Sequence, residues 1–331
     1  MKAILLEDFH KHLASGGIAE DAPIHGVVRD AEGVANLFGE EGLRMGLPQV
    51  GQVKSQPPRA HEAPPPGLRV LATRGQNVSV WIWIREWIQA AVQVDRLANL
   101  YKRMPLDQAA RDRLWDSSVL LFGVGSVGSR MAILLAEAGV GHIRIADPGV
   151  FEIENVMRHE GDLTDLGRLK AQLVADRLHR VNPDIRVESY PVDLCAPENE
   201  TLLNQAFQGV HLVIGATDRL RCQLHMNQKS FARGIPAIFP GCYELARGGE
   251  VLYVLPGRTS FCLECLRGGF SRPEQDTRLD YTNAVDPADY QGEPGMNAAV
   301  SLIVDVAVPL ALGILLQGTD AELAKRIQPN A

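Results

Sequence analysis

Apolar and polar residues alternate in a regular way only after about residue 95 of the chain. Continuous apolar runs at 118–123 and 210–218 predict strands that are buried on both faces. Leucine and valine at helical spacing across 165–184 predict an amphipathic helix. Further predicted elements are helices at 95–117 and 129–141 and strands at 142–147, 185–191, 234–241 and 248–256. Strands that alternate with helices predict an α/β fold with a doubly wound, mostly parallel sheet.

Residues 1–94 lack this alternation, and we expect a small N-terminal accessory region there, followed by a larger domain at 95–331. Five prolines within 56–67 predict a linker or a long extended loop. The apolar stretch 77–93, which holds three tryptophans, predicts a strand that passes into a helix. We expect these tryptophans to lie in a core; a docking surface for a partner is the alternative.

Composition and charge narrow the class of protein. The chain has 331 residues, a formal net charge of −7 and a pI near 5.7, which disfavours a general nucleic-acid binder. No secretory signal opens the sequence, and five cysteines, an odd number at low density, favour a reducing cytoplasm over a disulfide scaffold. The apolar stretch 296–316 has the length of a membrane span. Asp305 at its middle and Pro309 favour instead a helix that is buried in the protein or at a dimer interface, and no membrane is expected.

Three glycines with G-x-G-x-x-G spacing, Gly123, Gly125 and Gly128, follow the first predicted strand and open a helix. This is the context in which such a turn binds a phosphate at a helix N-terminus, as in Rossmann-like folds. Asp147 lies 19 residues after Gly128, at the end of the next strand, where an acidic residue can bind ribose hydroxyls. These residues fit an NAD-dependent oxidoreductase and an ATP-dependent enzyme equally well.

Four later residues favour chemistry at a triphosphate. Negative charge develops when a carboxylate attacks a phosphate, and cations stabilise it. Arg158 can bind phosphate oxygens with its planar guanidinium, and Lys170 supplies a point charge at the start of a helix. Asn155 can hydrogen-bond a phosphate oxygen or orient Arg158, and Asp218 at the end of a buried strand can hold Mg²⁺.

Five motifs occur in order along the chain: GVGSVG at 123–128, IAD at 145–147, ENVMR at 154–158, LGRLK at 166–170 and ATD at 216–218. With this set the sequence resembles the ThiF/MoeB/HesA adenylyltransferases, which are related to the adenylation domains of ubiquitin-activating enzymes. The resemblance covers roughly residues 95–317 and implies a ThiF/MoeB-like adenylation domain at 95–331. Two positions depart from the family pattern: Gly149 replaces a second acidic residue, and His159 replaces a glutamine.

The resemblance also implies a reaction and a set of contacts. Family members use ATP and Mg²⁺ to adenylylate the C-terminal glycine carboxylate of a ubiquitin-like or sulfur-carrier protein. Asp147 would then bind the ribose, Asn155, Arg158 and Lys170 the phosphates, and Asp218 the metal. A homodimer is also implied. An arginine of one subunit often enters the ATP site of the other in this family, and Arg96 and Arg103 are the candidates here.

A single C-x-x-C, Cys262 and Cys265, is the remaining chemical feature. In the resembling family this position often supplies two of four zinc ligands, but no cysteine or histidine follows Cys265, so a structural zinc site would be incomplete. The segment 270–294, where the family often carries a thioester-forming cysteine, holds none. Cys265 first, or Cys262, could accept the activated carboxylate as a thioester. Alternatively the adenylate passes to another thiol or amine, or both cysteines are structural.

The sequence therefore predicts an adenylyltransferase that acts on a ubiquitin-like or sulfur-carrier protein, with a possible downstream thiol acceptor protein. Adenylylation of a peptide or small carboxylate, with residues 1–94 as a substrate clamp, is one alternative. An NAD-dependent oxidoreductase is a second, and a binding module without catalysis that docks a partner through the tryptophan-rich stretch is a third.

Overall fold

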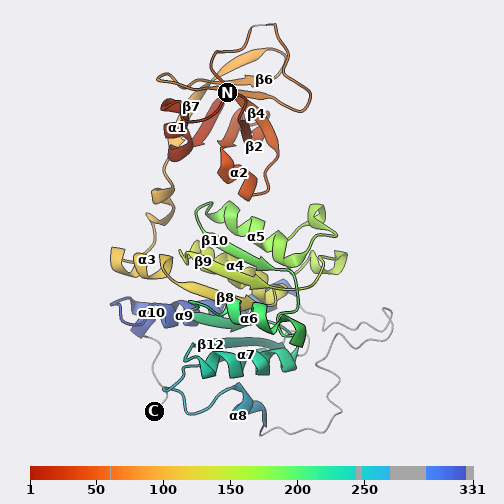
Figure 1. Cartoon of the computed structure of the whole chain (residues 1–331), viewed down its shortest axis with the longest axis vertical. Helices are drawn as coiled ribbons and strands as arrows, with labels where there is room; N and C mark the ends of the chain where they lie inside the picture. Colours follow the sequence, from red (N-terminus) through yellow and green to blue (C-terminus); the bar gives the residue numbers. More distant parts are fainter. Residues whose placement is uncertain (60, 244–247, 269–295, 326–331) are drawn as a thin grey trace. The chain divides into compact units, whose positions relative to one another are not determined.

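The computed structural model describes residues 1–59, 61–243, 248–268 and 296–325. It divides into two compact units, one of Met1–Met104 with Asn182–Asp184 and one of Pro105–Val181 with Ile185–Ala331 (Figure 1). The first unit thus ends ten residues after position 94, where the regular alternation of the sequence begins.

The N-terminal unit is built on a closed β-barrel with strand order β1-β3-β2-β4-β5-β6-β7. Parallel pairing of β1 with both β3 and β7 closes it. The strands are β1 (Lys2–Leu6), β2 (Pro23–Arg29), β3 (Val34–Phe38), β4 (Gln49–Lys54), β5 (Val70–Thr73), β6 (Val80–Trp83) and β7 (Trp87–Asp95), and the helices are α1 (Glu7–Ala14), α2 (Glu40–Arg44) and the 3₁₀ turn η1 (Leu97–Tyr101). Alternate strand residues, among them Leu5, Leu37 and Ile82, are fully buried inside the barrel. Closure leaves the sheet without an unpaired edge.

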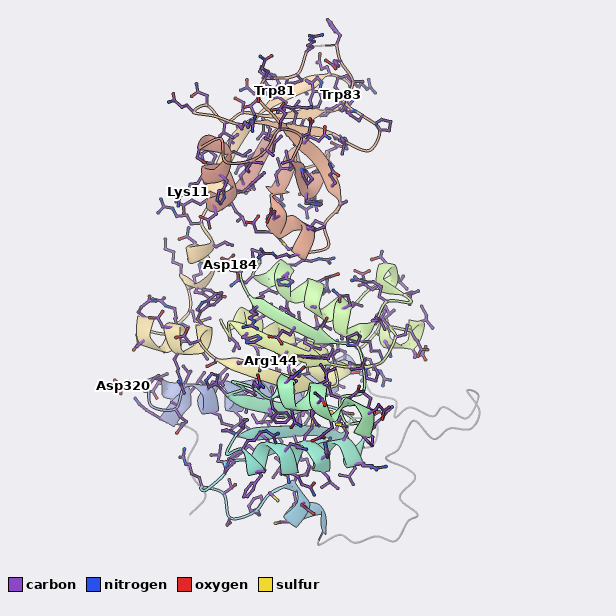
Figure 2. All side chains as sticks on the ribbon, in the orientation of Figure 1. Lys11, Trp81, Trp83, Arg144, Asp184 and Asp320 are labelled. Carbon is purple, nitrogen blue, oxygen red and sulfur yellow. A yellow bond between two sulfur atoms is a disulfide. The ribbon has the colours of Figure 1, made fainter. Side chains whose placement is uncertain are left out.

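One sequence prediction for this unit is wrong, and one pair of alternatives can be narrowed. The stretch 77–93 is not a strand followed by a helix but the hairpin β6–β7, in which Trp83 pairs with Trp87 across the turn. Figure 2 labels two tryptophans of β6, Trp81 and Trp83. The β-branched and aromatic residues of this stretch suit a strand throughout. The proline-rich segment 56–67 connects the parallel strands β4 and β5 of one barrel, so of the two predicted alternatives, a linker or a long extended loop, the loop applies. Its Glu62 carbonyl accepts a hydrogen bond from Trp87 Nε1 at 2.6 Å.

The second unit contains the predicted doubly wound sheet, with strand order β10-β9-β8-β11-β12-β13. The strands are β8 (Ser118–Phe122), β9 (His142–Ala146), β10 (Arg186–Tyr190), β11 (Leu212–Gly215), β12 (Ala237–Tyr243) and β13 (Gly248–Val254). All neighbours pair in parallel except β12 and β13, which are antiparallel. The chain runs from β8 through β9 to β10 and then returns to place β11 on the other side of β8. The strand order therefore reverses at β8, the position where such sheets bind ligands.

Helices cover both faces of this sheet. They are α3 (Gln108–Trp115), α4 (Ser126–Glu137), α5 (Lys170–Val181), α6 (Glu200–Ala206), α7 (Leu220–Ala232), α8 (Leu263–Gly268), α9 (Asn297–Leu315) and α10 (Glu322–Lys325). One core joins α3, α4, α5 and α9 to side chains such as Val119 and Ile143, and a second core joins α6, α7 and α8 to Leu120 and Phe122. Consecutive residues of β8 thus enter opposite cores, which explains its continuous apolar sequence.

Helix α9 is the predicted apolar helix of 296–316. It is long and apolar enough, by length and composition alone, to be a candidate membrane span among the described residues. Its Val304, Ala307 and Ala311 are fully buried in the core that α9 shares with α4, as expected for a helix packed inside a protein. Leu302 and Val306, on the same helix, are exposed.

Candidate active site

The glycine turn between β8 and α4 needs glycine for two different physical reasons. Gly123 has a φ of +82°, and a Cβ there would lie 2.8 Å from the Ala216 carbonyl oxygen. A Cβ on Gly128 would lie 1.9 Å from the carbonyl oxygen of Gly123, closer than real atoms approach. Gly125 differs, because nothing lies within 4 Å of its Cβ position. Gly123 and Gly128 are thus required by the turn itself, whereas Gly125 faces open space.

Gly125 is also the residue from which helix α4 begins. No side chain caps this end of α4 among the described residues, so the N–H groups of its first turn are available to a ligand. A helix N-terminus with free N–H groups and a positive dipole end is suited to bind a phosphate. The turn lies at the carboxyl end of β8, and the Ala216–Thr217 backbone after β11 packs against Gly123.

Asp147 lies at the end of β9 and is held by two backbone groups. Its Oδ2 accepts a hydrogen bond from Val124 N at 2.7 Å, and its Oδ1 accepts one from Gly149 N at 2.7 Å. Each carboxylate oxygen keeps a second lone pair, so Asp147 can still accept a hydrogen bond from a ribose hydroxyl. The bond to Val124 fixes Asp147 against the glycine turn.

Lys170, the first residue of α5, lies beside Asp147. A Cβ built on Gly149 would lie 2.9 Å from Asp147 Oδ1 and 3.5 Å from Lys170 Nζ, so the space at Gly149 is bounded by both groups. Because Gly149 has no side chain, where the family usually has a second acid, the Lys170 side chain can border this space.

Asp218 follows β11 and completes this group of charged residues. Its side chain reaches solvent, but protein surrounds it on the other sides, and this burial raises the pKa of its carboxyl above the ordinary range. The carboxylate of Asp147 raises this pKa further, while Arg219 and Lys170 oppose the shift. A carboxylate held near a second carboxylate fits a magnesium site, because a bound cation offsets their repulsion.

Asn155 and Arg158 come from the segment after Asp147. Asn155 Oδ1 accepts a hydrogen bond from Glu152 N at 3.0 Å and so closes the short turn η2 (Ile153–Asn155). Arg158 is half-buried, and its backbone N–H donates a hydrogen bond to the Asn155 carbonyl oxygen at 3.0 Å. The described contact of Asn155 is with the backbone, and the predicted phosphate contacts of both residues stay predictions.

Sequence reasoning treated His159 only as a departure from the family pattern. Its side chain is buried, with Nε2 at 2.7 Å from the Val124 carbonyl oxygen. Gly161 N donates a hydrogen bond to His159 Nδ1 at 3.0 Å. Because a backbone N–H can only donate, Nδ1 is the acceptor and Nε2 carries the proton. Burial, the largest cause, lowers the pKa of His159, so the ring is neutral. Its hydrogen bond to the Val124 carbonyl oxygen fixes this residue of the glycine turn.

A model of the ThiF family matches residues 97–328, more than half of the chain. The chain belongs to the ThiF family. It is 29% identical over 181 residues to the sulfur carrier protein ThiS adenylyltransferase of Escherichia coli strain K12, covering 54% of this chain and 70% of that protein. It is 27% identical over 162 residues to ubiquitin-like modifier-activating enzyme 5 of Caenorhabditis elegans, covering 47% of this chain and 38% of that protein. This ThiF-family chain is accordingly an adenylyltransferase.

The chain also resembles solved structures. The crystal structure of Escherichia coli MccB with AMPCPP and MccA is similar with a TM-score of 0.53 and 18% identity. The similarity covers 67% of this chain and 60% of that chain, and it supports the Rossmann-like fold.

Two cysteines of this ThiF-family chain form a disulfide. Cys195 and Cys222, to which the sequence pattern assigned no role, form a disulfide across 27 residues of sequence. The turn after β10 and the first turn of α7 meet in space, which no local pattern reveals. The sequence did not predict this disulfide.

Cys262 directly precedes α8 and Cys265 lies in its first turn, with their Sγ atoms 3.7 Å apart. Burial raises the pKa of the Cys262 thiol, but hydrogen bonds from the Asn227 side chain and from backbone groups of Cys265 outweigh it, so the net pKa is lowered. Cys265 is exposed. The segment 270–294, in which the sequence lacks a thioester-forming cysteine, lies outside the described residues.

Arg96 and Arg103, the candidates for insertion into a partner's ATP site, belong to the N-terminal unit. Arg96 Nε lies 3.2 Å from Glu7 Oε2 and forms an ion pair with it inside that unit. A role for either arginine in a partner's ATP site stays a prediction.

Proposed function

We propose that this chain uses ATP and Mg²⁺ to adenylylate the C-terminal carboxylate of a ubiquitin-like or sulfur-carrier protein. The observation that carries the proposal is the gathering of the uncapped α4 N-terminus, Asp147, Lys170 and Asp218 around the reversal point of the sheet. Membership of the ThiF family and the named substrates of its relatives support the choice of carrier protein.

Each group of this site has a part in the proposed reaction. Gly125 leaves room for phosphate oxygens to approach the N–H groups of α4, and Asp147 accepts a hydrogen bond from the ribose. Asp218 would hold Mg²⁺, which neutralises phosphate charge when bound. Lys170, with Arg158, stabilises the charge that builds up as a carboxylate oxygen attacks the α-phosphate and pyrophosphate leaves. Catalysis here is positioning and charge stabilisation, with little acid–base chemistry.

The test is ATP–pyrophosphate exchange in the presence of a candidate carrier protein. Lys170→Ala and Arg158→Ala should each lower the exchange rate by about 10²–10³, the scale of one lost stabilising group. Lys229→Ala is the matched control, because Lys229 is a cation on α7 that pairs with Glu200. Exchange at the wild-type rate in Lys170→Ala and Arg158→Ala would rule out this assignment.

We further propose that a thioester follows, with Cys262 rather than Cys265 as the acceptor. The lowered pKa of the Cys262 thiol supports this choice, because the thiolate is the nucleophile. Its sulfur would form a bond to the acyl carbon while the C–O bond to AMP breaks, and AMP leaves with the negative charge. A reductant-sensitive enzyme–carrier band should be lost in Cys262→Ser and kept in Cys265→Ser, with pyrophosphate exchange intact in both. A band that survives in Cys262→Ser would overturn this step.

A homodimer and a cytoplasmic location are part of the same proposal. Exposed apolar side chains in the segment 150–169 support an interface with a second copy; they are Val150, Ile153, Met157, Leu163, Leu166 and Leu169. ATP as a co-substrate supports a location inside the cell. Light scattering should give a dimer for the wild type and a monomer for Met157→Glu, and a monomeric wild type would contradict the dimer.

A further inference from the structure

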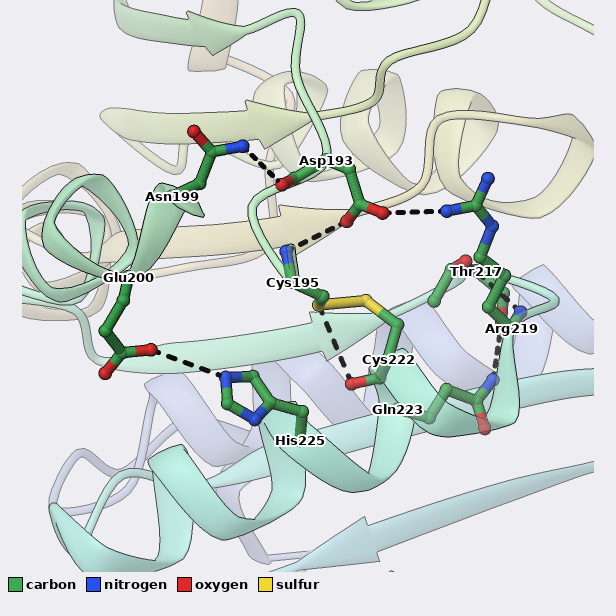
Figure 3. Close-up of a disulfide and its surroundings, with 9 residues drawn as sticks. All are labelled: Asp193, Cys195, Asn199, Glu200, Thr217, Arg219, Cys222, Gln223 and His225. Atoms are coloured by element: carbon green, nitrogen blue, oxygen red, sulfur yellow. Dashed lines mark hydrogen bonds and ion pairs between the residues drawn. A yellow bond between two sulfur atoms is a disulfide. The ribbon is translucent and has the colours of Figure 1, made fainter. Parts of the chain in front are cut away.

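The disulfide Cys195–Cys222 joins two segments that are distant in sequence, as Figure 3 shows. Cys195 lies in the turn between β10 and α6, and Cys222 lies in the first turn of α7. Both residues are half-buried, so a small reductant can reach them. The bond therefore ties the N-terminal end of α7 to the loop that connects β10 to α6.

Asp193 makes a second, weaker connection between the same two segments. Its Oδ1 accepts a hydrogen bond from Cys195 N at 2.9 Å, and its Oδ2 lies 2.7 Å from Arg219 Nη1 (Figure 3). The side chains of Asp193 and Arg219 are 35% and 38% exposed, and an ion pair at that exposure holds weakly. The disulfide thus adds a covalent constraint on the start of α7 to this weaker one.

The constrained segment carries Asp218, the proposed magnesium ligand. Asp218 directly precedes Arg219, and Gln223 Nε2 donates a hydrogen bond to the Thr217 carbonyl oxygen at 2.6 Å (Figure 3). The Ala216–Thr217 backbone packs against Gly123 of the glycine turn. Covalent fixation of Cys222, one turn of helix after Asp218, therefore also restricts the position of the Asp218 carboxylate.

We propose that Cys195 and Cys222 form a reversible thiol–disulfide site that controls the affinity of the nucleotide site for Mg²⁺·ATP. A dithiol reductant transfers two electrons and two protons to the S–S bond, which yields two cysteine thiols and the disulfide of the reductant. The start of α7 then keeps the Asp193–Arg219 ion pair, hydrogen bonds and its packing against the second core, but it loses its covalent link. Asp218 is then less often in its binding position. The consequence for ATP rests on the proposed function, whereas the change in order of α7 does not.

The experiment compares oxidised and dithiothreitol-reduced full-length protein. Mass spectrometry after alkylation without reductant should find Cys195 and Cys222 linked in the oxidised form. Hydrogen exchange of the 216–224 backbone should be about tenfold faster after reduction, with exchange in β8 unchanged as the internal reference. The Kd for ATP in Mg²⁺ should rise by about fivefold, in proportion to the lost population of the ordered state.

Variants separate this site from the other cysteines. Cys222→Ser without reductant should behave like the reduced wild type, and Cys242→Ser, which removes a half-buried free thiol on β12, should respond to reductant like the wild type. Equal hydrogen exchange of 216–224 in both redox states would overturn the proposal. Zinc held at Asp193, Cys195 and Cys222 in air-purified protein, with both thiols reduced, would overturn it as well. If neither form binds Mg²⁺·ATP but exchange still differs, the proposed function has failed and the redox site stands.

Discussion

The His159→Ala variant tests whether the glycine turn depends on a buried imidazole. His159 is 7% exposed, and both its ring nitrogens are hydrogen-bonded to backbone groups. Alanine would leave the Val124 carbonyl and the Gly161 N–H buried without these partners, at a cost of about 1–3 kcal/mol each. The ring also packs edge-on against Phe151 at 5.0 Å. With that packing lost as well, we expect the free energy of unfolding to fall by about 3–5 kcal/mol.

The His159→Gln variant restores the residue that the family usually has. An amide can donate one hydrogen bond and accept another, so both backbone partners can remain satisfied. The expected loss is therefore only about 1 kcal/mol. Urea unfolding at pH 7.5 should order the stabilities as wild type, His159→Gln and His159→Ala. His225→Ala is the control, because the His225 ring is partly exposed and its contact with Glu200, at 3.8 Å, is a long one.

The pH dependence gives a second, independent test of the same ring. Burial lowers the pKa of His159 in the folded state, and Lys170 adds to this while Asp147 and Glu160 oppose it. The unfolded state therefore binds a proton at a higher pH than the folded state does. The stability that the neutral ring contributes is complete above the ordinary pKa of 6.5 and is lost as the pH falls below it toward the folded-state pKa.

The glutamine variant isolates this contribution, because glutamine does not titrate. The difference in unfolding free energy between wild type and His159→Gln should shrink or change sign between pH 7.5 and pH 5.5. A difference that is constant across this range, or His159→Ala as stable as the control, would refute the assigned role of the ring.

Two further predictions concern residues of the nucleotide site, Asp218 and the glycines of the turn. Asp218→Asn should shift the Mg²⁺ titration of pyrophosphate exchange to higher Mg²⁺ concentration, and an unchanged titration would make Asp218 a structural residue. The raised pKa of Asp218 means that its negative charge destabilises the protein without a bound cation, so the variant should also melt at an equal or higher temperature. Gly128→Ala should prevent stable folding, because its methyl group would lie 1.9 Å from the Gly123 carbonyl oxygen. Gly125→Ala has open space around its Cβ, so this variant should melt near the wild-type temperature. It should weaken ATP binding by about tenfold in calorimetry. Equal behaviour of the two alanine variants would contradict the division of roles within the turn.

The sheet and most of the candidate site could be predicted because their signals are local. The runs that became β8 and β11 are apolar on both faces, and parallel strands buried by two helical layers have this pattern. The carboxyl ends of neighbouring parallel strands share one edge, so Gly123, Asp147 and Asp218 had to meet once the strand order was known. Nothing more than strand assignment and one reversal of order was needed.

The barrel was missed because glycines interrupt its strand patterns. A Cβ at Gly26 would lie 2.2 Å from the Asn36 carbonyl oxygen, and one at Gly51 would lie 2.2 Å from that of Val70. Glycine is needed at both places for strands to approach, yet in the sequence it suggests loops. The pairing of Cys195 with Cys222 was missed for a different reason, since contact between a loop and a distant helix has no local sequence signal.

The two departures from the family pattern, Gly149 and His159, are both linked to Asp147 by hydrogen bonds, Gly149 directly and His159 through Val124. Gly149 N donates to Asp147 Oδ1, while Asp147 Oδ2 accepts from Val124 N. The carbonyl of that same Val124 accepts from His159 Nε2. One residue of the glycine turn is therefore held between Asp147 and His159, and the missing side chain at Gly149 leaves space that Lys170 borders. Both hydrogen bonds that Asp147 accepts come from backbone N–H groups and do not depend on the side chains at 149 and 159, so a chain that lacks two usual family residues can still keep the geometry that the proposed reaction requires.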